Sequence, residues 1–159
     1  TYNFPAIITN CSNNYGPYQY PEKLIPLIIS NCVDKKNIPV YGNGENIRDW
    51  LYVEDHCGAI YAALLHGKIG HTYNIGGNYE MQNIQIVKKI CNILDNIKPQ
   101  LDGKSYSNLI SFINDHDLRE KYKRKSLHRS SQIDDYKRVN ISTSKIINEL
   151  LKAPADLNS

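Results

Sequence analysis

Short β-branched segments alternate with segments of helical periodicity along the sequence as far as Pro99. Residues 5–9 read Pro-Ala-Ile-Ile-Thr, an apolar run of the kind found in buried parallel strands. Residues 83–97 show the strongest amphipathic pattern, and Asn83 is the expected N-cap of that helix. Because strands and helices alternate, we expect an α/β fold.

The same patterns predict the other elements. Residues 12–21 are expected to form a polar loop, and Gly67 is expected to end a helix as the residue just past its C-terminus. Residues 106–114 are expected to form a short helix or strand. The strands are too few for a complete doubly wound sheet, so we expect only part of one. The expected strands span 5–9, 38–41, 50–53 and 72–75, and the expected helices span 22–33, 56–66, 83–97 and 142–151.

The charge pattern sets the last part of the chain apart. The net charge is +3, and residues 116–138 hold eight Lys/Arg against four Asp/Glu. We expect the α/β region to span 1–115, a basic and exposed or disordered insertion to span 116–141, and a C-terminal helix and tail to span 142–159. Tyr122 and Tyr136 could stack on bases, but the insertion also carries acids and has no recognised motif, so we do not expect nucleic-acid binding.

Several protein classes are disfavoured by composition. No apolar run approaches the roughly 20 residues of a membrane span, and the first residues lack the basic region of a signal peptide. We therefore expect no membrane association and a cytoplasmic location. The four cysteines are widely spaced and form no C-x-x-C pair, which argues against a metal site and a disulfide framework. Most of them are expected to be buried.

The segment 11–17 reads Cys-Ser-Asn-Asn-Tyr-Gly-Pro and follows the end of the first expected strand. In open α/β sheets, ligands bind beyond the carboxyl ends of the strands. Asn13 and Asn14 can offer both donors and acceptors to a nucleotide or a sugar. Taken alone, two adjacent asparagines more often form an ordinary polar turn.

Five segments in this order and at these separations resemble the extended short-chain dehydrogenase/reductase family, most closely its branch that removes water from dTDP-glucose. The resemblance runs from about residue 5 to residue 94 and implies the last strands of a partial Rossmann-like parallel sheet, followed by a smaller C-terminal substrate-binding domain. The segments are Asn-Asn-Tyr-Gly-Pro at 13–17, Pro-Glu-Lys-Leu-Ile-Pro at 21–26, Pro-Val-Tyr-Gly at 39–42, Ile-Arg-Asp-Trp-Leu-Tyr-Val-Glu-Asp at 47–55 and Tyr-Asn-Ile-Gly-Gly at 73–77.

The resemblance also implies roles for individual residues. Asn13 would contact the nucleotide sugar and Asn14 the NAD cofactor. Lys23 and Leu24 would open a helix beneath the diphosphate, where a lysine supplies a point charge. The alternative for Lys23 is a solvated helix face. The thymine and deoxyribose pocket would be lined by Pro39, Val40 and Tyr41.

Arg48 is the strongest single candidate. Its planar guanidinium can bind phosphate oxygens in a bidentate way that lysine cannot reproduce. The alternative is an ion pair with Asp49 or Asp55, both of which we interpret as structural. Asn83 would reach the substrate while capping its helix.

The closing loop of the pocket departs from the family pattern. The family reads Asp-Arg-Pro-Gly-His-Asp there, whereas residues 114–119 read Asn-Asp-His-Asp-Leu-Arg. The simplest alignment keeps Asp115 and His116 as substrate residues and loses the family arginine. This half of the nucleotide pocket therefore differs from that of the family.

The catalytic elements of the family are not found in this sequence. The family oxidises the sugar with NAD, eliminates water and returns the hydride, using a Tyr-x-x-x-Lys pair and a Gly-rich turn that holds the pyrophosphate. No such turn precedes a helix here, and no such pair lies upstream of Thr9. We therefore expect no catalytic residue in this chain, a main NAD site outside it, and an N-terminal Rossmann half and homodimer contacts that it does not contain.

Two other functions are compatible with these features. One is a different sugar-nucleotide epimerase or decarboxylase of the same superfamily, which shares the Asn-x-Tyr-Gly-Pro and Arg-Asp features. The other is a catalytically inactive binding or interaction module, in which apolar surface that normally packs on the other half is exposed and favours self-association.

Overall fold

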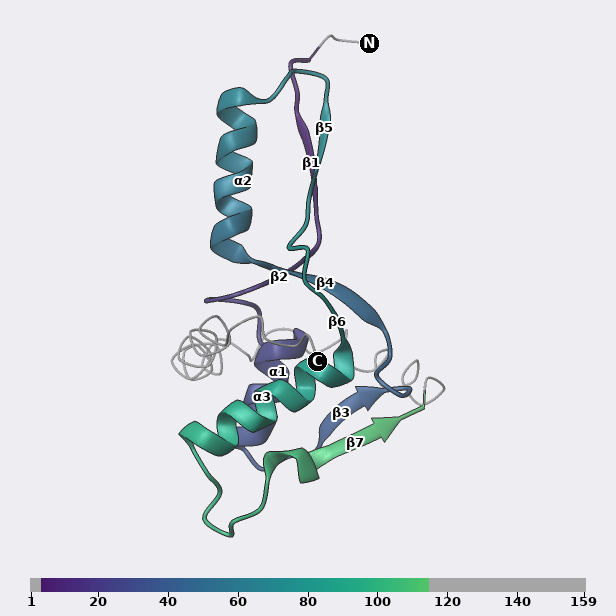
Figure 1. Ribbon diagram of the computed structural model, residues 1–159, viewed down its shortest axis with the longest axis vertical. Helices are drawn as coiled ribbons and strands as arrows, with labels where there is room; N and C mark the ends of the chain where they lie inside the picture. Colours follow the sequence, from purple (N-terminus) through teal and green to yellow (C-terminus); the bar gives the residue numbers. More distant parts are fainter. Residues whose placement is uncertain (1–3, 115–159) are drawn as a thin grey trace, which may run out of the picture. The chain divides into compact units, whose positions relative to one another are not determined.

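A computed structural model describes residues 4–114 of the chain. The described residues form two compact units (Figure 1). The first unit comprises residues 4–16 and 47–81, and the second comprises residues 17–46 and 82–114. Both units are built from helices and parallel strand pairs, which confirms the α/β prediction.

The first unit contains two small sheets and one helix. Strand β1 (Ile8–Cys11) pairs in parallel with β5 (Thr72–Ile75), with Ile8 opposite Thr72 and Cys11 opposite Ile75. Strand β4 (Ile47–Tyr52) lies between β2 (Asn13–Tyr15) and β6 (Glu80–Gln82). Helix α2 (Val53–His66) continues directly from β4 and lies beside the β1–β5 pair in Figure 1.

Four strands of this unit differ from the prediction. β1 spans Ile8–Cys11 instead of residues 5–9, and the amide of Ile8 donates to the carbonyl of His71. Pro5, the first residue of the predicted strand, has no N–H to contribute to a ladder. β4 begins at Ile47, ahead of the expected start at Trp50. The expected loop at 12–21 instead begins with strand β2, and β6 was not expected at all. Both are three-residue strands formed by pairing with β4, a tertiary effect that local propensity does not report.

Helix α2 begins three residues earlier than predicted, and its acidic residues Glu54 and Asp55 lie in its first turn, where the helix dipole favours negative charge. Gly67 ends the helix at its other end, as predicted, but as the C-cap rather than as the residue after it. Gly67 caps the helix in an extended conformation, with φ −70° and ψ 148°, so no left-handed residue ends the helix there. A Cβ at Gly67 would clash with the backbone carbonyl oxygen of Ala63, so close approach explains the glycine.

The second unit packs two helices and a parallel strand pair around one apolar core. Its elements are α1 (Leu24–Val33), β3 (Ile38–Tyr41), α3 (Asn83–Ile97), the 3-10 helix η1 (Tyr106–Leu109) and β7 (Ile110–Ile113). β3 pairs with β7, with Ile38 opposite Ile110. Residues 106–114 therefore hold both a short helix and a strand. The core side chains are Ile25, Ile28, Ile29, Cys32, Ile38, Val40, Ile86, Val87, Ile90, Cys91, Leu94 and Tyr106.

Helix α1 begins at Leu24, two residues after the predicted start at Glu22. Lys23 is the N-cap, and the amide of Leu27 donates to its carbonyl at 2.9 Å, the first backbone bond of the helix. Pro26 is buried within the first turn, where its missing N–H breaks no helical bond.

The start of α3 requires a correction. Gln82 rather than Asn83 is the N-cap, and its amide donates to Oε1 of Gln85 at 2.9 Å in a capping box. Asn83 is the first helical residue, and its amide donates to the carbonyl of Asn46 at 3.0 Å. The amide of Ile84 donates to the carbonyl of Gly44 at 2.9 Å. The backbone carbonyls of Gly44 and Asn46 therefore already accept from two of the amides at the N-terminus of α3.

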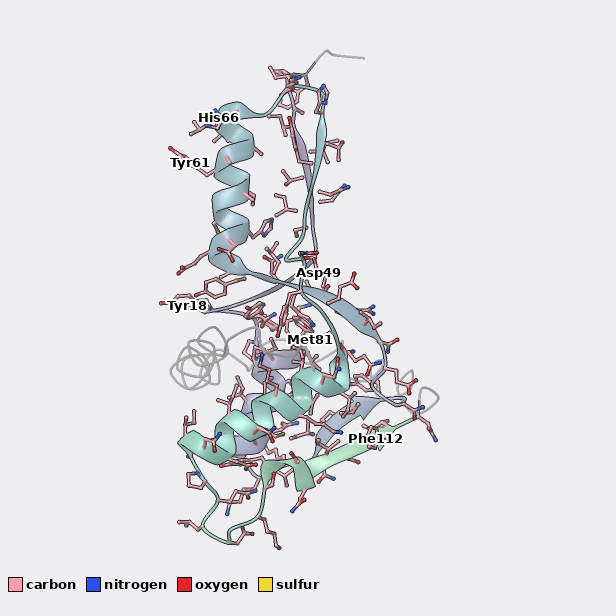
Figure 2. The ribbon with its side chains drawn as sticks, in the orientation of Figure 1. Tyr18, Asp49, Tyr61, His66, Met81 and Phe112 are labelled. Atoms are coloured by element: carbon pink, nitrogen blue, oxygen red, sulfur yellow. The ribbon has the colours of Figure 1, made fainter. Side chains whose placement is uncertain are left out.

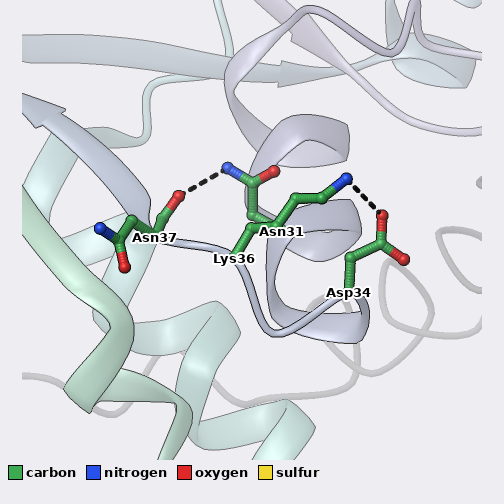
Figure 3. Close-up of polar contacts among 4 residues, drawn as sticks. All are labelled: Asn31, Asp34, Lys36 and Asn37. Atoms are coloured by element: carbon green, nitrogen blue, oxygen red, sulfur yellow. Dashed lines mark hydrogen bonds and ion pairs between the residues drawn. The ribbon is translucent and has the colours of Figure 1, made fainter.

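Helix α1 ends in a Schellman motif without a glycine. The amide of Lys36 donates to the carbonyl of Asn31 at 2.8 Å, and the amide of Lys35 donates to that of Cys32 at 3.1 Å. Lys35 adopts a left-handed conformation with φ 53°. Figure 3 shows the side chains that support this turn: Lys36 pairs with Asp34 at 3.1 Å, and Nδ2 of Asn31 donates to the carbonyl of Asn37 at 2.9 Å.

The cysteines differ from the expectation that most are buried. Cys32 and Cys91 are buried in the core of the second unit, whereas Cys11 and Cys57 are exposed, and all four are free thiols. A hydrogen bond with Cys91, followed by burial, raises the pKa of Cys32. Cys32 therefore stays a neutral core residue.

Candidate functional site

Asn13 and Asn14 lie on β2, and Arg48 lies on the strand that pairs with it. Asn13 is opposite Trp50 and Asn14 is opposite Leu51 in the β2–β4 register. Arg48 precedes Trp50 by two residues on β4. The first unit therefore places the two asparagines of one motif on the strand that pairs with that of Arg48, which belongs to a different motif.

The two asparagines have different surroundings. Asn13 is exposed, whereas Asn14 is half-buried. Nδ2 of Asn14 donates to the carbonyl of Ser12 at 3.1 Å and to Sγ of Cys11 at 3.3 Å. These bonds fix the Asn14 amide against the end of β1, while Asn13 faces solvent.

The guanidinium of Arg48 is exposed and remains available to an anion. Its Nη1 donates to the carbonyl of Ile47 at 3.1 Å. The alternative ion pair with Asp49 or Asp55 is wrong, because neither carboxylate lies within ion-pair distance of Arg48. Asp49 instead accepts hydrogen bonds at 2.8 Å from the amides of Gly77 and Tyr79, which confirms its structural interpretation.

An aromatic cluster in the same unit was not singled out from the sequence. The ring of Tyr15 packs edge-on against Trp50, with centroids 6.5 Å apart, and lies 5.6 Å from the ring of Tyr52. Burial, followed by the proximity of Tyr79 and Asp55, raises the pKa of Tyr15. Tyr15 therefore stays protonated at neutral pH and can act as a hydrogen-bond donor but not as a base. The β2–β4 pairing that joins these rings could not be read from their sequence spacing.

The remaining described candidates belong to the second unit. Lys23 is exposed at the start of α1, Leu24 is the first residue of that helix, and the first turn contains no acidic residue. This arrangement leaves the positive end of the helix dipole uncompensated by a carboxylate.

The three pocket candidates on β3 alternate in burial. Pro39 and Tyr41 are half-buried, whereas Val40 is 3% exposed and belongs to the core. A ligand at β3 would therefore meet the side chains of Pro39 and Tyr41, and Val40 would serve to support the strand.

Asn83 carries a polar atom that the described part of the chain does not satisfy. Its Oδ1 is buried and has no hydrogen-bond partner among residues 4–114. A buried unpaired acceptor is costly, so a ligand that donated a hydrogen bond here would relieve that cost. The last two candidates, Asp115 and His116, lie outside the described residues.

Residues 4–114 contain no group of three or more His, Cys, Asp or Glu side chains that could hold a metal ion. None of the helices there has both the length and the apolar character that a membrane crossing requires.

Comparison with known proteins identifies the relatives of this chain. Residues 1–76 match the NAD-dependent epimerase/dehydratase family. The chain is 58% identical over 124 residues to dTDP-glucose 4,6-dehydratase of Escherichia coli, a match that covers 75% of this chain and 34% of that protein. The chain thus spans about a third of the length of the curated relatives it matches.

Solved structures agree with the sequence comparison. The crystal structure of dTDP-glucose 4,6-dehydratase from Bacillus anthracis in complex with NAD superimposes with a TM-score of 0.61 at 47% identity, covering 72% of this chain and 34% of that one. UDP-glucuronic acid 4-epimerase from Bacillus cereus gives a TM-score of 0.56 at 28% identity, covering 69% of this chain and 32% of that one. The resemblance drawn from the sequence motifs is confirmed.

Proposed function

Residues 1–76 belong to the NAD-dependent epimerase/dehydratase family, and we propose that the chain is the nucleotide-sugar-binding portion of a dTDP-glucose 4,6-dehydratase, a lyase. The observation that carries the proposal is the exposed Arg48 guanidinium, which has no carboxylate partner in the described part of the chain. It lies on the strand paired with Asn13. A guanidinium beside an amide can bind a diphosphate and a sugar hydroxyl.

The second unit, taken by itself, carries residues suited to bind a phosphate and a base. Lys23 adds a positive charge at the start of α1, where a phosphate is also favoured by the helix dipole. Pro39 and Tyr41 offer an apolar edge and an aromatic ring for the base. Asn83 offers a buried acceptor that a hydroxyl or an imide N–H of the ligand would satisfy.

Among the described residues, we assign one contact with NAD, at Asn14. Asn14 presents an amide that is already oriented by its bonds to Ser12 and Cys11, and it would contact the cofactor next to the sugar held by Asn13. The chain offers no Gly-rich turn for the pyrophosphate, and we propose that a longer polypeptide supplies the main cofactor site. When bound, NAD accepts and returns a hydride, and the residues of this chain position the sugar for that transfer.

The exposed apolar surface of the first unit supports the proposed N-terminal half. Helix α2 has no buried residue, and Leu64 is 72% exposed. Figure 2 shows Tyr61 pointing away from the β1–β5 pair. Parallel strands are normally covered on both faces. We propose that this surface packs against a Rossmann half supplied by a longer polypeptide, which would also supply the dimer contacts.

An activity assay tests whether the catalytic residues are supplied from outside this chain. The purified chain, incubated with dTDP-glucose and NAD, is expected to form no 4-keto-6-deoxy sugar, because the residues that transfer protons and hydride are supplied elsewhere. Turnover by the chain alone would overturn this part of the proposal.

A competition assay separates the dehydratase from the epimerase alternative. We expect dTDP to bind more tightly than UDP, because the base would lie against the apolar edge of Pro39 and the ring of Tyr41. Tighter binding of UDP would favour a relative of the UDP-sugar epimerases instead.

A further inference from the structure

Asp49 fastens one loop of the first unit to strand β4. Its Oδ1 accepts a hydrogen bond from the amide of Tyr79, and its Oδ2 accepts one from the amide of Gly77, both at 2.8 Å. The carbonyl of Tyr79 in turn accepts from the amide of Trp50 at 3.0 Å. The loop 76–79 is therefore tied to β4 by three hydrogen bonds on two successive residues. Figure 2 labels Asp49 at this position.

The two glycines of the loop make this approach possible. A Cβ at Gly76 would lie 2.8 Å from Oδ2 of Asp49, and a Cβ at Gly77 would lie 2.7 Å from the carbonyl carbon of Trp50. Asn78 follows in a left-handed conformation with φ 50°. The Tyr-Asn-Ile-Gly-Gly motif thus supplies a backbone that can approach the Asp49 carboxylate closely enough to donate to it.

Successive side chains of a strand point to opposite faces, so Asp49 on β4 meets partners other than its neighbour Arg48. Arg48 and Asp49 are adjacent, yet they form no ion pair. The Asp49 carboxylate is engaged by backbone amides, and hydrogen bonds to an ionised acceptor are among the stronger ones in proteins. The Tyr79 amide above all, with that of Gly77 and against the effect of burial, lowers the pKa of Asp49, so the carboxylate stays charged at neutral pH.

We propose that Asp49 is a positioning residue for the nucleotide-sugar site: its clamp on the loop 76–79 fixes β4 next to Arg48 and leaves the Arg48 guanidinium available to the diphosphate. The same hydrogen bonds also help to fix the position of Asn13. Asn13 is in register with Trp50, and the amide of Trp50 donates to the carbonyl of Tyr79 in the loop 76–79. This inference rests on the proposed function in one respect, namely that Arg48 binds the diphosphate.

Whether Asp49→Asn weakens or tightens the binding of dTDP distinguishes a positioning role of Asp49 from an effect of its charge alone. If Asp49 acted only through its charge, Asp49→Asn would remove a negative group near the diphosphate and tighten the binding of dTDP. The positioning role predicts the opposite, about tenfold weaker binding of dTDP in calorimetry, because the clamp is loosened. Asp55→Asn removes a nearby exposed carboxylate without touching the clamp and is the matched control, which should bind dTDP no more weakly than the wild type.

A second measurement needs no ligand. ¹⁵N relaxation of the backbone amides of Arg48 and Asn13 should show rigid residues in the wild type and in Asp55→Asn, and increased mobility in Asp49→Asn with the fold retained. Unchanged mobility in Asp49→Asn, or tighter dTDP binding, would overturn the positioning role. Failure of the wild type to bind dTDP would overturn the proposed function, whereas the relaxation result would still decide whether Asp49 holds Arg48 and Asn13 in place.

Discussion

The backbone amide of Tyr106 donates a hydrogen bond of 2.8 Å to Oδ1 of Asp95, and the Ser105 hydroxyl donates one of 2.6 Å to Oδ2. Asp95 lies near the end of α3, so its carboxylate joins that helix to the start of η1. The Tyr106 hydroxyl completes the connection by donating to the carbonyl of Lys98 at 2.9 Å. The second unit thus closes its core with a polar network around a buried tyrosine.

Asp95→Ala is expected to destabilise the chain by about 1–3 kcal/mol, because the Tyr106 amide would be left without its acceptor. Thermal or urea unfolding measures the change. Glu22→Ala removes an exposed carboxylate from the same unit and should change stability by less than about 0.5 kcal/mol. Equal effects of the two substitutions would show that the network contributes nothing specific.

Lys35→Gly is expected to stabilise the chain by about 1 kcal/mol, because a side chain in the left-handed conformation carries a penalty that glycine avoids. Lys36→Gly, one residue further along the same turn, should give no gain, because Lys36 is not among the positive-φ residues and glycine would remove its ion pair with Asp34. A loss of stability in Lys35→Gly would contradict the Schellman assignment.

Two glycine-to-alanine substitutions in the first unit are expected to act in opposite directions. Gly77→Ala should destabilise by about 2 kcal/mol or more, because the new Cβ would meet the backbone of Trp50. Gly58→Ala, within α2 and with nothing within 4 Å of the new Cβ, should stabilise by about 0.5–1 kcal/mol. Unfolding curves of the two variants give both signs in one experiment.

The hydrogen bonds from the amides of Gly77 and Tyr79 to the Asp49 carboxylate should be lost only in strong acid. A carboxyl whose pKa is lowered on folding contributes stability that is present above its unfolded pKa and disappears as the pH falls through its folded pKa. The amide signals of Gly77 and Tyr79 should therefore keep their hydrogen-bonded NMR shifts until the pH is below the ordinary aspartate value of about 3.9. Asp49→Asn should show no such step, and a step above that value in the wild type would contradict the assignment.

The exposed face of α2 should promote self-association of the isolated chain. Light scattering is expected to report a mass that rises with concentration, and Leu64→Lys should reduce that rise. Leu101→Lys changes an exposed leucine of the other unit and serves as the control. A mass independent of concentration would show that this face does not associate.

The sequence predicted the elements that are specified by the residues within and directly beside them. Strands 38–41 and 72–75 have the predicted bounds, because each is a short run of strand-forming residues bounded by turn residues. Strands β2 and β6 escaped prediction because they are three residues long, polar, and formed only by pairing with β4. Gln82 was missed as the N-cap because its partner is the Gln85 side chain, and one-residue shifts at helix ends are common.

The candidate site was predictable in its members but not in its arrangement. The motifs selected Asn13 and Arg48, but their placement on paired strands depends on β2, which was not expected. The role of Asp49 was predictable only as structural, since its partners Gly77 and Tyr79 are 28 and 30 residues away. Contacts of that kind are set by the fold.

The most direct test of the proposed nucleotide-sugar site is calorimetric titration of dTDP-glucose into the purified chain. Arg48→Ala is titrated in parallel, and Lys68→Ala is the matched control for the loss of a positive charge. We predict saturable binding by the wild type and Lys68→Ala, and binding at least about tenfold weaker in Arg48→Ala, because the guanidinium holds the diphosphate. Equal binding by all three folded proteins, or none by the wild type, would contradict the assignment of a nucleotide-sugar site to this chain.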